Sequence, residues 1–172
     1  MHNPPALLII RPANRIPADA DLCRRSGWQP VSFPLIHIHP VRLAADPTLP
    51  ERLTTCLADA AAVFWVSPTA VETALPLLSG SLLHSLSQPQ IAVGSGTAKA
   101  LRQAGFAHVV APDGGHDSEA VLALPLWQHL NPGASVVIIR GREGRNTLPD
   151  TLCRRGFQVA CADIYQRQPL TP

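Results

Sequence analysis

Short apolar runs alternate with helix-like segments along almost the whole chain. The runs are rich in Val, Ile, Leu, Phe and Ala, as strands are when both faces of a sheet are covered. Each run is followed by a segment with the spacing and the end signals of a helix. We predict strands at residues 6–10, 61–66, 90–93, 109–111, 135–139 and 157–164, and helices at 18–26, 50–60, 69–78, 95–104, 118–130 and 146–155.

This order predicts an α/β fold in which parallel sheets are flanked by helices. Local signals support the helix ends. Ser67-Pro68 supplies an N-cap residue with proline at the first helical position, and Gly105 is placed to close a helix. Pro125 is expected to break the helix at 118–130. Segment 30–38 is apolar but contains Pro34, which predicts an edge position or an exit from a sheet.

Composition and charge narrow the class of protein. The chain has 172 residues, of which 46% are hydrophobic and 15% charged, so it can bury a core and is not globally disordered. A net charge of +2 without a long basic run does not favour a nucleic-acid partner. No apolar stretch is long enough to cross a membrane, and MHNPPALLII does not resemble a secretory leader. We therefore expect a cytoplasmic protein with no membrane partner.

Arginine is far more frequent than lysine in this chain. The chain has thirteen arginines and one lysine, Lys99. Arginine pairs with carboxylates through two parallel hydrogen bonds, although codon bias in a GC-rich genome accounts for most of these residues.

The cysteines form no CxxC pair and lie in or beside apolar segments, so we interpret them as buried free thiols in a reducing compartment. They are Cys23, Cys56, Cys153 and Cys161.

Three strand-to-helix turns are candidates for a binding site. They are VSPTAV (66–71), VGSGTAKAL (93–101) and IRGREGRNTL (139–148). Each places small or hydroxyl-bearing residues before a helix, where free backbone N–H groups and the helix dipole favour an anion. Ligands of open α/β sheets gather where strands end. Ordinary helix capping is the alternative for each turn taken singly.

Other motifs are weaker. GSGTAK (94–99) is a partial dinucleotide-binding pattern with Lys99 in place of the third glycine, so a nucleotide-binding Rossmann-like enzyme stays an alternative. The sequence has no GxSxG nucleophile elbow, which disfavours a hydrolase with a serine nucleophile. His116 lies in a loop near two aspartates, where a solvated turn is favoured over catalysis. Tyr165, the single tyrosine, is predicted at the end of the last strand. Its phenol either donates a hydrogen bond to a leaving group, or its ring packs against the protein while its hydroxyl contacts solvent.

Four segments together resemble one enzyme family. They are LLIIRP (7–12), FPLIHIHP (33–40), AVGSGTAKALRQAGF (92–106) and IIRGREGRNTLPDTLCRRGFQVACADIYQR (138–167). The last of them is the most specific, and together they extend over nearly the whole chain. The sequence resembles the uroporphyrinogen-III synthase family.

The resemblance implies a two-domain α/β enzyme with one discontinuous domain. Residues 1–37 would begin domain 1, residues 38–165 would form an inserted domain 2, and residues 166–172 would be the return linker. The chain stops at QPLTP, where members of the family continue, so the resemblance implies that domain 1 is incomplete. We expect its unpaired strand edges to favour self-association. A non-catalytic two-lobed module that binds an acidic metabolite is a further alternative.

The implied reaction is the cyclisation of hydroxymethylbilane to uroporphyrinogen III with inversion of ring D, without a cofactor or a metal. In the resemblance Tyr165 is the catalytic residue near the leaving hydroxyl. Arg145 either binds substrate or stabilises its own loop. The substrate-binding residues implied by the resemblance are Arg11, Ser67, Ser95, Gly96, Thr97, Gly141 and Arg145.

Overall fold

The computed structural model describes residues 4–42, 45–115 and 117–170, so His116 lies outside the described residues. The chain divides into two compact units. Unit 1 consists of Met1–Pro40 and Gln166–Pro172, and unit 2 of Val41–Tyr165. The boundaries taken from the family resemblance, after residues 37 and 165, stay a prediction about the domains of the whole protein.

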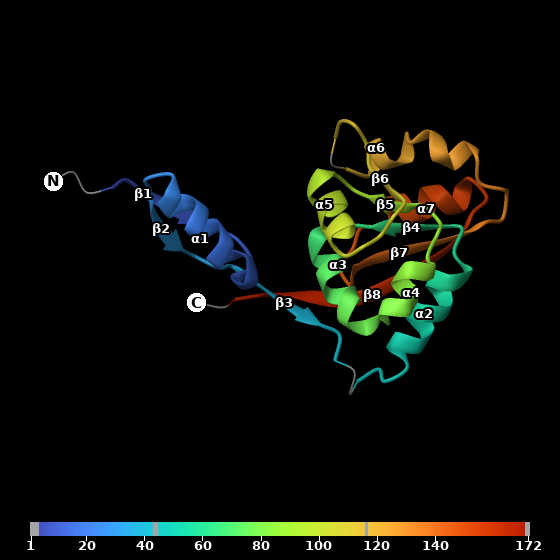
Figure 1. Cartoon of the computed structure of the whole chain (residues 1–172), viewed down its shortest axis with the longest axis horizontal. Coiled ribbons are helices and arrows are strands. Elements are labelled where there is room, and N and C mark those ends of the chain that lie inside the picture. The colour runs from blue at the N-terminus through green and yellow to red at the C-terminus, as the bar shows by residue number, and fades with distance from the viewer. Residues whose placement is uncertain (1–3, 43–44, 116, 171–172) are drawn as a thin grey trace. The chain divides into compact units, whose positions relative to one another are not determined.

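Unit 1 is built around a two-stranded parallel sheet. Strand β1 (Ala6–Ile9) pairs with β2 (Gln29–Ser32), and the connection between them holds the 3-10 helix η1 (Ala13–Arg15) and helix α1 (Ile16–Arg25). Figure 1 shows α1 lying along these two strands, and α1 contacts both. The parallel pairing requires this crossover, because a tight hairpin can join only antiparallel strands.

The predicted strand at 30–38 is two strands. Strand β2 ends at Ser32 and β3 begins at Ile36 (Ile36–Pro40), and the two belong to different sheets. The chain leaves the first sheet around Pro34, which confirms the predicted exit. The physical reason is that proline cannot donate a ladder hydrogen bond. At the other end of unit 1, the Leu170 N–H donates to the Leu35 carbonyl at 2.9 Å.

Unit 1 buries little apolar surface of its own. Its hydrophobic cluster has three buried members, Ile9, Ala20 and Cys23, with Ile16 packed against them. The large hydrophobic side chains that stay exposed in the described residues all belong to this unit. They are Leu7, Leu8, Ile10, Leu22, Trp28, Val31, Phe33 and Leu35, each between 42% and 58% exposed.

Unit 2 is organised by a parallel sheet. The full strand order of the larger sheet is β3-β8-β7-β4-β5-β6, and the pairs β8–β7, β7–β4, β4–β5 and β5–β6 are all parallel. This arrangement confirms the predicted α/β class with helices between parallel strands. The strands that follow β3 are β4 (Ala62–Trp65), β5 (Gln90–Ala92), β6 (Val109–Val110), β7 (Ser135–Gly141) and β8 (Gln158–Pro169).

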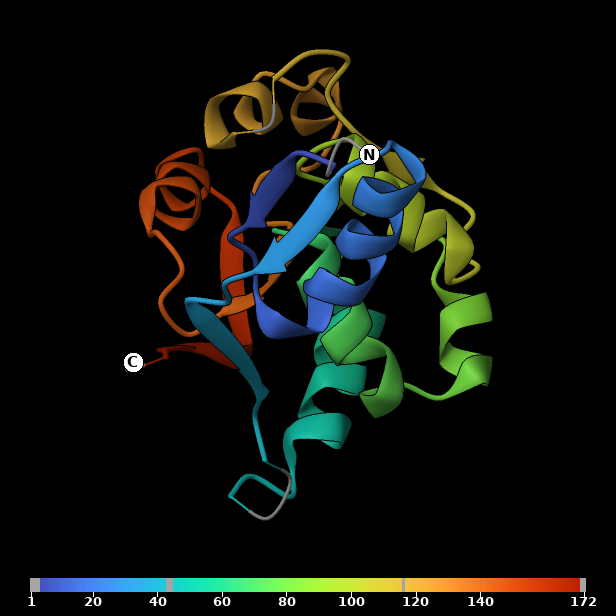
Figure 2. The same cartoon turned by 90° about the vertical axis from the view of Figure 1, so that its left-hand side faces the viewer.

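Helices cover both faces of this sheet. Figures 1 and 2 show α6 and α7, in orange tones, on one side, with α2 to α5, in teal to yellow-green, on the other. The helices are α2 (Leu49–Asp59), α3 (Pro68–Ala74), α4 (Gly80–Ser85), α5 (Ser95–Gln103), α6 (Ser118–Leu122) and α7 (Thr147–Arg154), with 3-10 turns η2 (Leu75–Leu77) and η3 (Pro125–Gln128).

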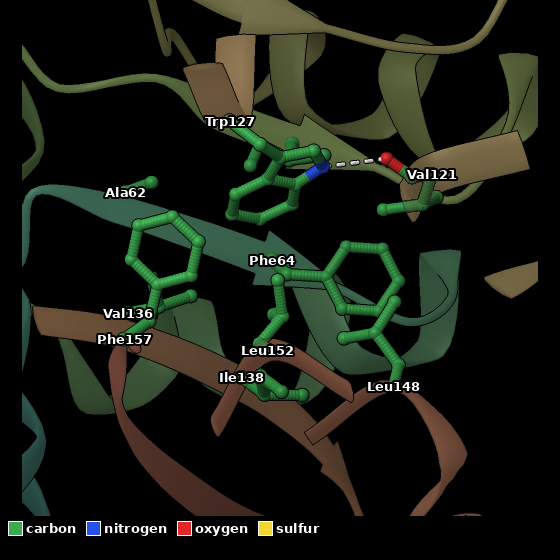
Figure 3. Close-up of a cluster of buried hydrophobic side chains, with 10 residues drawn as sticks. Ala62, Phe64, Val121, Trp127, Val136, Ile138, Leu148, Leu152 and Phe157 are labelled. Atoms are coloured by element: carbon green, nitrogen blue, oxygen red, sulfur yellow. Dashed lines mark hydrogen bonds between the residues drawn. The ribbon is translucent and has the colours of Figure 1, made fainter. Parts of the chain in front are cut away.

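Alternate residues of the central strands supply the two cores. Ala62 and Phe64 of β4 face α6 and α7, and Figure 3 shows Phe64 with Trp127 and Leu148 in this cluster. The Trp127 indole N–H donates to the Val121 carbonyl at 2.7 Å, so the buried ring has its polar atom satisfied. The intervening strand residues, such as Trp65, face the other layer, where Trp65 meets Phe106.

Two helix predictions need correction. The helix expected at 69–78 ends as an α-helix at Ala74 and is followed by the 3-10 turn η2. Gly80 begins α4, which the sequence analysis missed. Ser79 caps α4 by accepting the Leu82 N–H at 3.3 Å, a signal that was visible as serine before an apolar segment. The predicted break at Pro125 is confirmed, since α6 ends at Leu122 and η3 begins at Pro125.

The interpretation of the cysteines as buried is wrong for three of them. All four are free, but only Cys23 is buried. Cys56 and Cys153 are next in sequence to the buried residues Leu57 and Leu152, and neighbours on a helix point in different directions. Partial burial raises the pKa of the Cys161 thiol, an effect larger than the lowering by the nearby Arg140 guanidinium.

Within the described ranges, no helix is long and apolar enough to span a membrane. The same residues hold no cluster of three or more His, Cys, Asp or Glu side chains suited to a metal ion.

A buried polar network links β4 to β5 and to the end of α2. The Trp65 indole N–H donates to Gln90 Oε1 at 2.9 Å, and both residues are fully buried. Gln90 Nε2 donates to the Gln88 carbonyl at 3.1 Å, and Gln88 Nε2 to the Leu57 carbonyl at 2.7 Å. The side-chain polar atoms of Trp65 and Gln90 all have partners, which is the condition for tolerating glutamine inside a core.

We expect Gln90→Ala to lower the free energy of unfolding by about 1–3 kcal/mol, because it leaves the buried Trp65 N–H without an acceptor. Urea unfolding followed by tryptophan fluorescence measures this change. The control is Gln103→Ala on the exposed surface of α5, which should change stability by less than about 0.5 kcal/mol. Equal stability of the two variants would contradict the role of the buried network.

Candidate functional site

The three predicted turns follow three neighbouring strands. Ser67 comes after β4, Ser95 comes after β5, and Gly141 is the last residue of β7, in the sheet order β7-β4-β5. Backbone hydrogen bonds join the strand ends directly, from Val66 N to the Ile139 carbonyl and from Val93 N to the Trp65 carbonyl, both at 3.3 Å. Because the strands are parallel, the three turns lie at the same edge of the sheet.

The β4–α3 turn is a capped helix start. The Ser67 backbone is extended, with φ −168°, and its Oγ accepts the Ala70 N–H at 3.1 Å. Pro68 occupies the first helical position, where the lack of an N–H costs nothing. Ser67 is half-buried, so one side of its hydroxyl is directed into the protein.

The β5–α5 turn presents exposed donors. Gly94 is the N-cap residue and makes no side-chain cap, so backbone N–H groups of the first turn are not used by a capping side chain. Ser95 and Gly96 are exposed, whereas Thr97 is only 1% exposed. A Cβ atom at Gly96 would lie 3.8 Å from Pro68 Cγ, an ordinary contact. The protein's own atoms therefore do not require glycine at 96.

Tyr165 lies against Gly141. The two residues are partners in the β7–β8 register, after a shift between Arg140 and Gly141, and Tyr165 is fully buried. A Cβ atom at position 141 would come within 2.6 Å of Tyr165 Cε2 and 2.9 Å of Cζ. Real Cβ atoms do not approach other atoms this closely, so the ring position requires glycine at 141.

The Tyr165 side chain reaches across the end of β7. Its hydroxyl lies 3.3 Å from Ser67 Oγ, although β8 and β4 are not neighbours in the sheet. Strand β7 lies between them and ends at Gly141, so the missing side chain at 141 provides the passage for the ring. Ser67, Gly141 and Tyr165, three of the residues predicted for the site, are thus brought together by the sheet.

An ion pair that the sequence analysis missed stabilises the turn after β7. Arg140 Nε donates to Asp163 Oδ1 at 2.9 Å, and the arginine side chain is only 13% exposed. Its Nη1 donates to Asn146 Oδ1 at 2.9 Å and to the Arg145 carbonyl at 3.4 Å. One guanidinium therefore ties both ends of the loop after β7 to β8. Two charged residues inside apolar strands, one residue before Gly141 and two before Tyr165, were the available signal.

The remaining predicted arginines are exposed. Arg145 is exposed, and the bond recorded for it is made by its backbone carbonyl. Arg11 belongs to unit 1, where its Nε lies 3.2 Å from Asp19 Oδ2 in an exposed pair. The fold and the site define an α/β protein whose donor-rich turns and one buried tyrosine meet at the carboxyl edge of a parallel sheet.

A comparison with protein families shows which family this α/β chain matches. The model of the family described as uroporphyrinogen-III synthase HemD matches residues 18–172. The uroporphyrinogen-III synthase of Salmonella typhimurium is 35% identical over 163 residues, and that of Escherichia coli 32% over 171 residues. Each match covers 94% of this chain and 65% of the relative. The chain belongs to the uroporphyrinogen-III synthase family, and it spans about two thirds of the length of these relatives.

Solved structures show the same fold. A mutant uroporphyrinogen III synthase from the extreme thermophile Thermus thermophilus superposes with a TM-score of 0.63 at 18% identity, over 96% of this chain and 64% of that one. The enzyme from Helicobacter pylori gives 0.55 at 19% identity, over 84% of this chain and 58% of that one. The α/β arrangement is thus shared with uroporphyrinogen III synthases despite low identity.

We expect Gly141→Ala to lower the free energy of unfolding by about 1–3 kcal/mol, because the Tyr165 ring must shift to make room for the new methyl group. Denaturant unfolding measures the loss. Gly96→Ala is the matched control at the same edge of the sheet, where the new methyl group makes only an ordinary contact with Pro68 and the helical position favours alanine. A Gly141→Ala protein as stable as Gly96→Ala would contradict the close ring contact.

Proposed function

We propose that this chain carries out the reaction after which its family is named, the cyclisation of hydroxymethylbilane to uroporphyrinogen III with inversion of ring D. The observation that carries the proposal is the meeting of three strand-end turns and Tyr165 at one edge of the sheet, in a chain of this family. In the proposal, residues 38–165 form the inserted domain and residues 1–37 begin the discontinuous one.

The substrate proposed for this edge is a linear tetrapyrrole with eight carboxylates. Free N–H groups at a helix start bind carboxylates, and α5 presents such groups beside the exposed residues Ser95 and Gly96. Thr97 contributes its backbone N–H, because its side chain is buried. Arg145 and Arg11 are exposed guanidinium groups that can pair with acetate or propionate arms.

The proposed reaction mainly requires the protein to hold the two ends of the substrate in the correct relative position. The hydroxyl of ring A leaves as water with one added proton, which gives an azafulvene cation, and ring D attacks through its substituted carbon to give a spiro intermediate. Rearrangement and loss of a proton then close the inverted ring. Holding the two ends of a flexible chain together lowers such a barrier by several kcal/mol, on the order of 7–11 kcal/mol at most.

Tyr165 is proposed as the residue that assists departure of the hydroxyl. Its phenol lies at the strand edge where the turns converge, in contact with Ser67. Because Tyr165 is fully buried, the proposal includes an opening of this edge when the substrate binds. No cofactor or metal takes part in the proposed steps, and the exposed free thiols suit a cytoplasmic location.

Tyr165→Phe should lower turnover by about 10²-fold, the lower end of what a positioned acid contributes, while the fold is retained. The assay follows conversion of hydroxymethylbilane and separates the type III product from the uninverted isomer. It is run on this chain and on a chimera in which the Salmonella typhimurium relative supplies the part that the match leaves uncovered.

Phe157→Tyr, which leaves Tyr165 in place, is the control for an altered aromatic residue. Unchanged turnover in Tyr165→Phe would remove the phenol from the mechanism. Binding of hydroxymethylbilane without any type III product, in both the chain and the chimera, would favour the non-catalytic binding module.

Self-association through unit 1 is part of the same proposal. Eight large apolar side chains of unit 1 are exposed, and strands β1 and β2 pair only with each other in the described residues. Several of these side chains border a pocket of about 580 Å³ lined entirely by residues 7–28. Open strand edges beside exposed apolar surface promote pairing between chains.

We expect sedimentation velocity to show a concentration-dependent rise in mass for the chain, and Phe33→Glu to shift this rise to higher concentration. Phe33 is 54% exposed, so the charge should not disturb the core. Ala107→Glu in unit 2, where Ala107 is also exposed, serves as the control. A wild-type chain that stays monomeric at every concentration would rule out self-association.

A further inference from the structure

We infer that Ser67 is a positioning residue, which donates its hydroxyl proton to the Tyr165 phenolic oxygen and thereby directs the phenolic proton away from itself. The hydrogen-bond direction is part of the inference, since either hydroxyl can be the donor in this contact. The consequence for the reaction rests on the function proposed above. The inference assigns Ser67 to Tyr165 rather than to a carboxylate of the substrate.

The direction of the bond follows from counting protons at Ser67. Its Oγ accepts the Ala70 N–H at 3.1 Å as the cap of α3. In the described part of the chain, the Tyr165 hydroxyl, at 3.3 Å, is the other group recorded in hydrogen-bonding position. A serine hydroxyl has one proton and two lone pairs, and an N–H can only donate. We assign the Ser67 proton to Tyr165 Oη, the one acceptor recorded for it in the described residues, and the bond from Ala70 makes that O–H a better donor.

The direction of this bond determines where the phenolic proton points. Conjugation keeps a phenol O–H in the plane of the ring, so the proton has two favoured positions on opposite sides of the oxygen. A donor on the Ser67 side leaves the other position for the proton. The ring cannot turn freely to undo this choice, because it lies against Gly141 at a distance that leaves no room for even a methyl group.

Strands β8 and β7 and the turn after β4 thus act together on one hydroxyl group. Strand β8 carries the phenol, the end of β7 seats its ring, and the turn after β4 supplies the hydrogen bond that orients it. In the proposed reaction the departing hydroxyl needs a proton. When the phenol oxygen accepts a hydrogen bond from Ser67, the phenol does not donate its own proton to that serine. Its O–H is then directed to the opposite side.

The test uses the fact that Tyr165 is the single tyrosine of the chain. Ultraviolet resonance Raman spectra contain a tyrosine doublet whose intensity ratio is high when the phenol oxygen accepts a hydrogen bond and low when the phenol only donates. We expect a high ratio in the wild-type chain and in Ser67→Thr, and a lower ratio in Ser67→Ala. Ser79→Ala removes the equivalent cap of α4 and should leave the ratio unchanged.

Ser67→Asp is the most discriminating variant. Aspartate keeps the capping acceptor for Ala70, but its carboxylate has no proton to donate, so Tyr165 must become the donor. The ratio should fall in this variant even where Ser67→Ala proves too unstable to study. A low ratio in the wild-type chain, or a ratio that is the same in wild type and Ser67→Asp, would overturn the inference.

A kinetic measurement links the hydrogen bond to catalysis. In the chimera that converts hydroxymethylbilane, Ser67→Ala should lower kcat about tenfold or more with little change in KM, since positioning of an acid affects the chemical step. A rise in KM with unchanged kcat would show that Ser67 binds substrate and would overturn its positioning role. If no protein forms the type III product, the proposed function fails, while the Raman ratios still decide the direction of the bond.

Discussion

The sheet of unit 2 depends on one constraint, which is that strands β4 to β8 all run in the same direction with both faces covered. Parallel pairing forces every connection between these strands to cross back along a face, and the connections contain the helices α3 to α7. The same constraint places every strand-to-helix turn at one edge. Residues as distant in sequence as Ser67 and Tyr165 become neighbours because the sheet order, not the chain order, decides which residues meet at that edge.

The two units differ in how much of their apolar surface is buried. In unit 2 the central strands β4 and β7 are buried on both faces, and aromatic residues fill the layers on either side. In unit 1 the buried cluster has three members, while eight large apolar side chains remain exposed. Because stability is spread unevenly in this way, opening should begin in unit 1 and should leave the sheet of unit 2 largely protected.

The sequence was most informative where local patterns and burial agree. The strands at Ala62–Trp65 and Ser135–Gly141 are largely apolar, and the turn at Ser67-Pro68 has both helix-start signals, so their identity follows from composition and spacing. The split at Pro34 follows from the missing N–H of proline. Helix α4 was not predicted from its short segment, although Ser79 before it is a capping residue.

The site was only partly predictable. Gly141 and Tyr165 were singled out, but their contact depends on the register between β7 and β8, which no local pattern reports. The roles of Arg140 and Asp163 depend on the same pairing. Burial of Cys56 and Cys153 was wrongly inferred from apolar neighbours, because helical periodicity turns adjacent residues to different sides.

The irregularity in the pairing of β7 with β8 has a consequence for how this family can vary. Arg140 is paired with Asp163, but Gly141 is paired with Tyr165, so Ile164 is passed over. With uniform pairing, Gly141 would stand opposite Ile164, and the aromatic ring would emerge from the other surface of the sheet. The placement of the phenol is therefore a matter of parity: gain or loss of a single residue between 163 and 165 inverts it.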